Sequence, residues 1–256
     1  MSLLKSYLII FFIIVITTLL LPIQALLHIF KKRLSDIIPM IYHRIILRLL
    51  SIKIIVKGSV GENGSLIVSN HASWIDILIL SSIIKTSFVS KSEVSNWPLI
   101  SWLAKLQKTI FINRKNHKQL AKIADEIQHR ITKKQNVVLF PEGTSSDGNK
   151  VLPFKSSIFT LCKSEERDLN IQPVSIAYTK YNGLNMSRIE RMLIAWYGDM
   201  DLLSHIYKLI GSGSFEVEVT FHNKIDISEK KSRKEIALEC ESVVREGFLK
   251  SLNRGI

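Results

Sequence analysis

An uncharged, strongly apolar run from Ser6 to Leu27 constrains this chain more than any other feature. As a helix it is long enough to cross or enter the hydrocarbon core of a bilayer, which takes about 20 residues. Pro22 leaves open a second arrangement, in which the helix breaks and the chain returns to the same membrane surface. The run therefore predicts a membrane anchor that either spans the bilayer or enters one leaflet.

Basic residues after the apolar run indicate its orientation. No small-residue cleavage site follows it, and a basic cluster at 31–33 comes directly after, so we expect an uncleaved anchor rather than a signal peptide. Lys5 alone precedes the run, whereas Arg44 and Arg48 add to the charge behind it. The positive-inside bias therefore places the rest of the chain on the cytoplasmic side, at the inner membrane if the source is bacterial.

The stretch from Ile37 to Leu50 is apolar with His43, Arg44 and Arg48 interspersed. This pattern fits an interfacial helix whose cations meet lipid phosphates, and it fits an ordinary helix of the following domain equally well. We divide the chain into an anchor and interfacial helix at 1–50 and a catalytic domain at 51–256.

Past Leu50, short β-branched runs alternate with helical patterns. The expected strands are at 53–56, 66–69, 88–90, 109–113, 137–140, 171–177 and 215–221. Apolar residues recur at three- and four-residue steps from Lys118 to Lys134, and Ser232 with Glu235 forms a capping box before a second amphipathic helix. The alternation predicts an α/β domain with a mixed, largely parallel sheet covered by helices.

The charge and cysteine content limit the kinds of partner that the chain is expected to bind. Lys and Arg total 35 against 22 Asp and Glu, so the net charge of +13 favours a polyanion: nucleic acid, an anionic bilayer or a phosphate-bearing substrate. The apolar run and the absence of a nucleic-acid-binding motif favour anionic membrane lipid. Cys162 and Cys240 lie in apolar surroundings and are expected to be core residues in a reducing compartment. Neither the cysteines nor the histidines have metal-ligand spacing, so we expect no metal.

The segment from Asn70 to Asp76 carries the first candidate chemistry. It lies where an apolar strand gives way to a helix, and it contains His71 five residues before Asp76. Histidine is readily poised as a general base, and a carboxylate on its far nitrogen fixes the tautomer. Such a pair alone is also common among unrelated surface residues.

Of three further motifs, two follow expected strands and the third is itself an expected strand. Phe140 to Thr144 reads Phe-Pro-Glu-Gly-Thr, Phe111 to Arg114 reads Phe-Ile-Asn-Arg, and Ile171 to Ser175 is an apolar strand with one proline. A carboxylate and a guanidinium at strand ends suit ligand binding at the carboxyl edge of a sheet. Taken singly, each motif has an ordinary alternative: Glu142 can be a turn residue, Arg114 a surface arginine, and the proline segment an edge strand.

In this order and spacing, the four motifs resemble those of the glycerolipid acyltransferases, specifically bacterial 1-acylglycerol-3-phosphate acyltransferases. The resemblance runs from about Ser69 to Ile176, and a weaker likeness extends over Trp196 to Asp199. It implies that His71 is the base, that Asp76 orients it, and that Arg114 and Lys91 contact the substrate phosphate. It also implies that Glu142, Gly143 and Thr144 bind the acceptor, and that the proline motif shapes the acyl-donor side.

Two positions depart from the family pattern. Lys108 stands where members often have glycine, and Ser145 stands where arginine often follows Glu-Gly-Thr, so acceptor recognition is expected to differ. The resemblance implies transfer of an acyl group from acyl-CoA or acyl carrier protein to lysophosphatidic acid, without a cofactor. Another lysolipid, such as lyso-ornithine lipid, is the alternative acceptor. The sequence contains no hydrolase motif, which argues against a hydrolase. A non-catalytic basic protein would not need His71 and Asp76.

Overall fold

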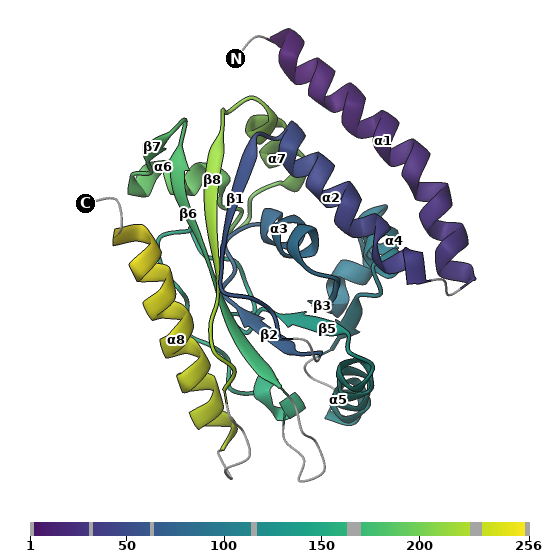
Figure 1. The fold of residues 1–256 in the computed structure, drawn as a ribbon, viewed down its shortest axis with the longest axis vertical. Helices are drawn as coiled ribbons and strands as arrows, with labels where there is room; N and C mark the ends of the chain where they lie inside the picture. The colour runs from purple at the N-terminus through teal and green to yellow at the C-terminus, as the bar shows by residue number, and fades with distance from the viewer. Residues whose placement is uncertain are drawn as a thin grey trace.

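The computed structural model describes residues 3–30, 33–61, 64–113, 117–162, 170–225 and 232–253. A mixed sheet at the centre is covered by helices on both faces (Figure 1). This confirms the expected fold class.

The sheet has the strand order β1-β8-β6-β2-β5-β3-β4, and the short β7 pairs with β6. The strands from β6 to β4 in this order are parallel to one another, whereas β8 runs antiparallel to β6 and parallel to β1. The strands are β1 (Ile52–Lys57), β2 (Leu66–Ser69), β3 (Thr86–Lys91), β4 (Ile110–Ile112), β5 (Asn136–Leu139), β6 (Ile171–Tyr181), β7 (Leu184–Asn185) and β8 (Phe215–Phe221). All seven expected strands are present, and β7 was not expected.

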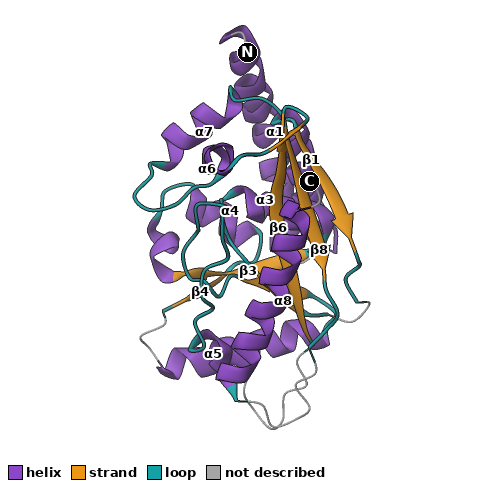
Figure 2. Ribbon diagram, turned by 90° about the vertical axis from the view of Figure 1, so that its left-hand side faces the viewer, coloured by secondary structure: helices purple, strands orange, loops and turns teal. Residues whose placement is uncertain are grey.

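Helices form two layers over this sheet. They are α1 (Leu3–Ile29), α2 (Ile38–Leu49), α3 (Ile75–Ile83), α4 (Ile100–Leu106), α5 (His117–Thr132), α6 (Arg188–Ile194), α7 (Leu202–Ile210) and α8 (Arg233–Asn253), with 3-10 turns at Arg33–Asp36, Ser92–Asn96 and Ile158–Cys162. Figure 2 shows the same arrangement turned by 90°. Alternate strand residues point to opposite faces, so Leu66 and Val68 join the core under α5 and α8, whereas Ile67 joins the core under α2 and α3.

The N-terminal helix α1 is continuous through Pro22, so the alternative in which the helix breaks at that residue is wrong. The chain instead reverses after Ile29, and α2 runs back beside α1 (Figure 1). Loss of one backbone donor is tolerated in this long helix because the interrupted turn is only one of about seven. By length and composition α1 can cross a membrane, and only 11% of its most apolar window is buried.

The second helix, α2, packs closely on α3. His43, Ile46 and Leu47 are buried, and the Nε of Arg44 donates to the carbonyl of Ser82 at 2.7 Å. These contacts favour the domain-helix alternative for this stretch. The boundary at residue 50 stays a prediction.

The proline strand β6 lies inside the sheet between β8 and β2, so its reading as an edge strand is wrong. The carbonyl of Pro173 accepts from the backbone N–H of His222, just beyond the last paired residues of β8. Because both backbone groups of one strand residue face the same side, the missing N–H of Pro173 costs no bond to β2. The proline is therefore compatible with a central strand.

Candidate active site

The four parallel strands β2, β5, β3 and β4 end at one edge of the sheet. His71 follows β2, Glu142 follows β5, Lys91 ends β3 and Arg114 comes shortly after β4. Parallel α/β sheets commonly bind ligands at this edge. The fold thus brings three of the four sequence motifs to neighbouring strand ends, although Arg114 itself lies outside the described residues.

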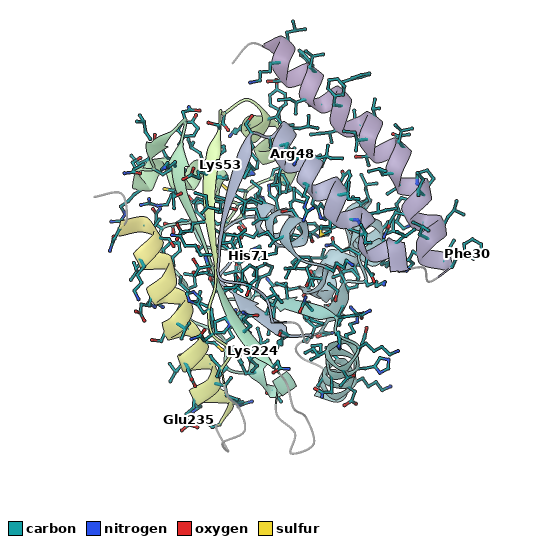
Figure 3. All side chains as sticks on the ribbon, in the orientation of Figure 1. Phe30, Arg48, Lys53, His71, Lys224 and Glu235 are labelled. Carbon is teal, nitrogen blue, oxygen red and sulfur yellow. The ribbon has the colours of Figure 1, made fainter. Side chains whose placement is uncertain are left out.

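The β2–α3 corner brings His71 and Asp76 into contact. The Nδ1 of His71 is 2.9 Å from Oδ2 of Asp76, which is fully buried in the first turn of α3. An ionised carboxylate only accepts hydrogen bonds, so this contact puts the imidazole proton on Nδ1 and leaves Nε2 as the basic nitrogen. The side chain of His71 remains 17% exposed, and Figure 3 labels it near the middle of the molecule.

Three further donors hold Asp76 in place. The backbone N–H groups of Ala72 and Ser73 donate to Oδ2 at 2.7 and 2.9 Å, and the hydroxyl of Tyr178 donates to Oδ1 at 2.6 Å. A buried carboxylate needs such partners to remain ionised. Burial and the neighbouring Asp76 charge raise the pKa of Tyr178 well above its usual value, so the phenol stays a donor.

Tyr178 is a site residue that the motifs did not reveal. It lies on β6, beyond the proline motif, and its alternation with Val174 and Ile176 marks it only as an inward-facing aromatic residue. A buried tyrosine usually finds a partner for its hydroxyl. That rule could have predicted a polar contact here, but the sequence could not have identified Asp76 as the partner.

Asn70 joins the catalytic corner to the neighbouring strand. Its amide nitrogen donates to the carbonyl of Ile176 at 2.9 Å, and its Oδ1 accepts from the N–H of the same residue at 2.8 Å. This paired contact replaces strand hydrogen bonds at the point where β2 ends. Asn70 therefore positions the backbone of His71.

The Phe-Pro-Glu-Gly turn completes the wall behind His71. The ring of Phe140 stacks on the imidazole with centroids 4.1 Å apart and an interplanar angle of 15°. The N–H of Gly143 donates to the carbonyl of Phe140 at 3.2 Å, and Gly143 has φ +69°, a conformation that favours glycine. The turn thereby fixes the plane of the imidazole.

Glu142 points inward and binds the backbone of the catalytic corner. Its Oε1 accepts from the N–H of His71 at 3.0 Å, and the residue is only 1% exposed. Burial raises the pKa of Glu142 to about 8, the N–H groups of His71 and Leu152 oppose this, and the charge of Asp76 adds to it. The observed contact is structural, and the expected contact of Glu142 with the acceptor stays a prediction.

Lys91 and Thr144 are exposed at the sheet edge, whereas Gly143 is buried. Neighbouring strands are spaced about 4.8 Å apart, so the end of β3, two strands from β2, lies roughly 10 Å from the base. That spacing allows a lysolipid headgroup to reach Lys91 while its hydroxyl meets His71. The binding roles of Lys91, Thr144 and Arg114 stay predictions.

The two departures from the family pattern have structural counterparts. Lys108 has φ +57°, which explains why glycine suits this position, and its ammonium pairs with Asp36. The hydroxyl of Ser145 donates to the backbone carbonyl of Trp196 beside the site. Among the described residues, no group of three potential metal ligands is present.

Comparison with known proteins agrees with this geometry. A family model described as Acyltransferase matches residues 52–177. The chain is 36% identical over 247 residues to a lyso-ornithine lipid O-acyltransferase of Brucella abortus (strain 2308), covering 94% of this chain and 92% of the relative. It is 27% identical over 183 residues to a 1-acyl-sn-glycerol-3-phosphate acyltransferase of Neisseria gonorrhoeae, covering 72% and 69%.

The solved structure of the 1-acyl-sn-glycerophosphate (LPA) acyltransferase PlsC from Thermotoga maritima has the same fold. The TM-score is 0.70 at 19% identity, with 98% of this chain and 96% of that chain covered. Fold, site and relatives together define an enzyme that transfers acyl groups to lysolipids. The chain belongs to the acyltransferase family.

Proposed function

We propose that this acyltransferase O-acylates lyso-ornithine lipid. The observation that carries the proposal is the identity of 36% over nearly the whole chain to an enzyme of that name, against 27% over 72% of the chain to a 1-acyl-sn-glycerol-3-phosphate acyltransferase. Lyso-ornithine lipid O-acyltransferases of Rhizobium meliloti and Rhodobacter capsulatus, at 34% and 36% identity, support the same acceptor. Lysophosphatidic acid, the acceptor first expected from the motifs, becomes the second candidate.

The basic side chains at the sheet edge keep lysophosphatidic acid in consideration. Lys91 is exposed at the end of β3, and Arg114 follows β4 in the sequence. An ornithine headgroup offers a carboxylate to such cations, whereas lysophosphatidic acid offers a phosphate with more charge. The two acceptors therefore differ in how much they need these cations.

The proposed reaction requires no covalent enzyme intermediate. The Nε2 of His71 removes the proton of the acceptor hydroxyl, and the oxygen attacks the carbonyl carbon of an acyl thioester. The tetrahedral intermediate collapses with cleavage of the carbon–sulfur bond, and the imidazolium returns its proton to the leaving thiolate. Asp76 stabilises the imidazolium between these two transfers. The donor is acyl-CoA or acyl carrier protein, and no cofactor takes part.

The apolar helix α1 supports a location at the membrane, where lysolipids reside. Many large apolar side chains are exposed along α1, including Phe11, Phe12, Leu19 and Leu26. We place the catalytic domain on the cytoplasmic side, because the basic residues follow the helix.

A product assay tests the acceptor. Purified full-length protein in detergent is incubated with a labelled acyl thioester and, separately, with lyso-ornithine lipid, lysophosphatidic acid, lysophosphatidylethanolamine or monoacylglycerol. The proposal expects the highest kcat/KM with lyso-ornithine lipid. A higher kcat/KM with lysophosphatidic acid would reverse the order of the two candidates, and no transfer to any lysolipid would reject both.

A further inference from the structure

The segment from Trp97 to Trp102, between β3 and the first turn of α4, exposes large apolar side chains that no part of the proposed reaction uses. Leu99 is 66% exposed, and both Trp97 and Trp102 are also exposed. Tryptophan is enriched where a bilayer meets water, because its ring is largely apolar and its N–H can reach polar groups. We call Trp97, Leu99 and Trp102 the apolar rim.

The backbone at Leu99 is held in an unfavourable conformation that directs its side chain outward. Its dihedral angles are φ +62° and ψ −51°, and the N–H of Ile100 donates to the carbonyl of Pro98 at 2.6 Å. This is a γ-turn of the rarer, positive-φ type, which is strained for a residue with a Cβ. Among the described residues, no burial of Leu99 within the protein offsets that strain, so an external partner is the natural source of compensation.

The apolar rim is attached to the candidate membrane helix. The amide of Gln24 on α1 is buried, and its Nε2 donates to the carbonyl of Leu106 at the end of α4 at 3.1 Å. A second bond from the same nitrogen reaches the carbonyl of Ser35 at 2.9 Å. Because α4 is fixed to α1 in this way, a bilayer that contains α1 also lies near the apolar rim.

The apolar rim also lies at the catalytic corner. The rings of Trp97 and Trp196 meet edge to face, with centroids 6.2 Å apart. The backbone N–H of Trp196 donates at 2.8 Å to the carbonyl of Ala72, the residue after His71. The apolar rim is therefore two contacts away from the candidate base.

The charges around the apolar rim suit an anionic lipid surface. Lys91 precedes it and Lys105 follows it, both exposed, whereas Glu93 is the one exposed acid between them. Lysine near an apolar surface can lie along it while its ammonium meets lipid phosphates. A protein partner would have to match this apolar and basic pattern beside a helix that is itself suited to lipid.

We propose that Trp97, Leu99 and Trp102 insert into the interfacial region of the bilayer and hold the mouth of the active site against one leaflet. The acceptor then keeps its acyl chain in the leaflet while its hydroxyl reaches His71. This inference rests on the proposed membrane association, but it assigns a second contact that α1 does not provide. Its partner is the lipid bilayer rather than a second copy of the chain.

Spin labels measure this contact in the full-length protein. A nitroxide is attached singly at Leu99→Cys or Trp102→Cys, in a background with Cys162→Ser and Cys240→Ala, and the protein is reconstituted into vesicles of phosphatidylglycerol and phosphatidylcholine. Leu238→Cys is the matched control for Leu99, because it is 65% exposed and lies on α8. Leu8→Cys reports on α1. Collision with oxygen, which concentrates in lipid, is compared with collision with a water-soluble nickel chelate.

We expect oxygen to dominate at positions 99, 102 and 8 and the nickel chelate to dominate at 238. Nickel accessibility at 99 and 102 equal to that at 238, with position 8 in lipid, would overturn this inference and leave the membrane anchor intact. Water-like values at all four positions would overturn both. Spin–spin broadening at 99 would reveal a second copy of the chain and would also overturn the inference.

An activity measurement gives an independent readout. Trp102→Gln should lower turnover of a bilayer-embedded lysolipid by about tenfold, which corresponds to ~1.4 kcal/mol and is less than full burial of a large apolar side chain contributes. Turnover of a short-chain, water-soluble lysolipid should stay within about twofold of wild type. Equal losses on both acceptors would contradict a membrane role and indicate damage to the site.

Discussion

The two ends of the active-site edge are built differently. At β2 and β5, backbone and side-chain hydrogen bonds hold the buried Asp76, and Glu142 holds the backbone of His71. At β3, Lys91 is exposed at the end of the strand. The fold thus fixes the groups proposed for proton transfer, whereas the side chain proposed to contact the headgroup is exposed and less constrained.

Asp76→Asn should have the largest effect at the buried end. The amide preserves the approximate shape but favours the wrong imidazole tautomer and cannot stabilise the imidazolium, so turnover should fall by roughly 10²- to 10⁴-fold. Steady-state kinetics on lyso-ornithine lipid measure the loss, and circular dichroism controls for folding. Unchanged turnover would make Asp76 a structural residue only.

Arg114→Ala tests the headgroup end with an intermediate effect. If this guanidinium contacts the acceptor phosphate, KM for lysophosphatidic acid should rise roughly ten- to hundred-fold, the equivalent of a charge-assisted hydrogen bond of ~1.5 to 3 kcal/mol. The rise should be smaller for lyso-ornithine lipid and absent for an uncharged monoacylglycerol. Arg114→Lys should recover part of the loss, because it keeps the charge without the planar fork.

Equal losses on all three acceptors would assign Arg114 to the fold or to the acyl donor. Arg114 would then play no part in binding the headgroup. Lys91→Ala is the parallel variant on β3, where the structure describes the side chain as exposed.

Tyr178→Phe removes one of the hydrogen bonds that hold Asp76. A single hydrogen bond to a charged group contributes about 1.5 to 3 kcal/mol, and the backbone donors from Ala72 and Ser73 remain. We therefore expect turnover to fall by about tenfold, less than with Asp76→Asn, while KM for every acceptor stays unchanged. A selective change in KM for one acceptor would place Tyr178 in acceptor binding.

Glu142→Gln should affect stability more than catalysis. Because the pKa of Glu142 is raised to about 8, the folded protein keeps this carboxyl protonated between about pH 4.5 and 8, where the unfolded chain loses the proton. Its contribution to stability is therefore lost as pH rises through this window. The glutamine variant should match wild type near pH 4.5 and melt at a higher temperature near pH 8, by about 2–4 °C for each kcal/mol.

Thermal unfolding at both pH values, in the same detergent, measures this difference. The Oε1 of glutamine can still accept from the N–H of His71, so turnover should change little. An equal melting temperature of wild type and variant at pH 8 would mean that the carboxyl is solvated.

The sequence was sufficient for the parts of the fold that depend on local pattern. The β-branched runs gave the strands, and Ser232 and Glu235 form the expected reciprocal cap at the start of α8. It was insufficient where long-range packing decides. The sequence left open whether the helix breaks at Pro22, and in the structure it continues. The central place of Pro173 depends on how far β8 extends.

The same distinction holds for the site. The contact of His71 with Asp76 was predicted from the four motifs taken together, since the spacing of the two residues alone is common among unrelated pairs. The contact of Tyr178 with Asp76 joins residues 102 positions apart, and no local pattern encodes it. The contact of the Oε1 of Glu142 with the backbone N–H of His71 joins residues 71 positions apart and was not predicted, whereas its contact with the acceptor stays a prediction.

Replacement of His71 is the decisive test of its role as the general base. The turnover number of His71→Ala is measured on lyso-ornithine lipid with a labelled acyl thioester, beside wild type at the same pH and detergent concentration. We expect a loss of at least 10²-fold, with the melting temperature and vesicle association of wild type retained. A folded His71→Ala protein with near-normal turnover would contradict it, because another group would then have to remove the hydroxyl proton.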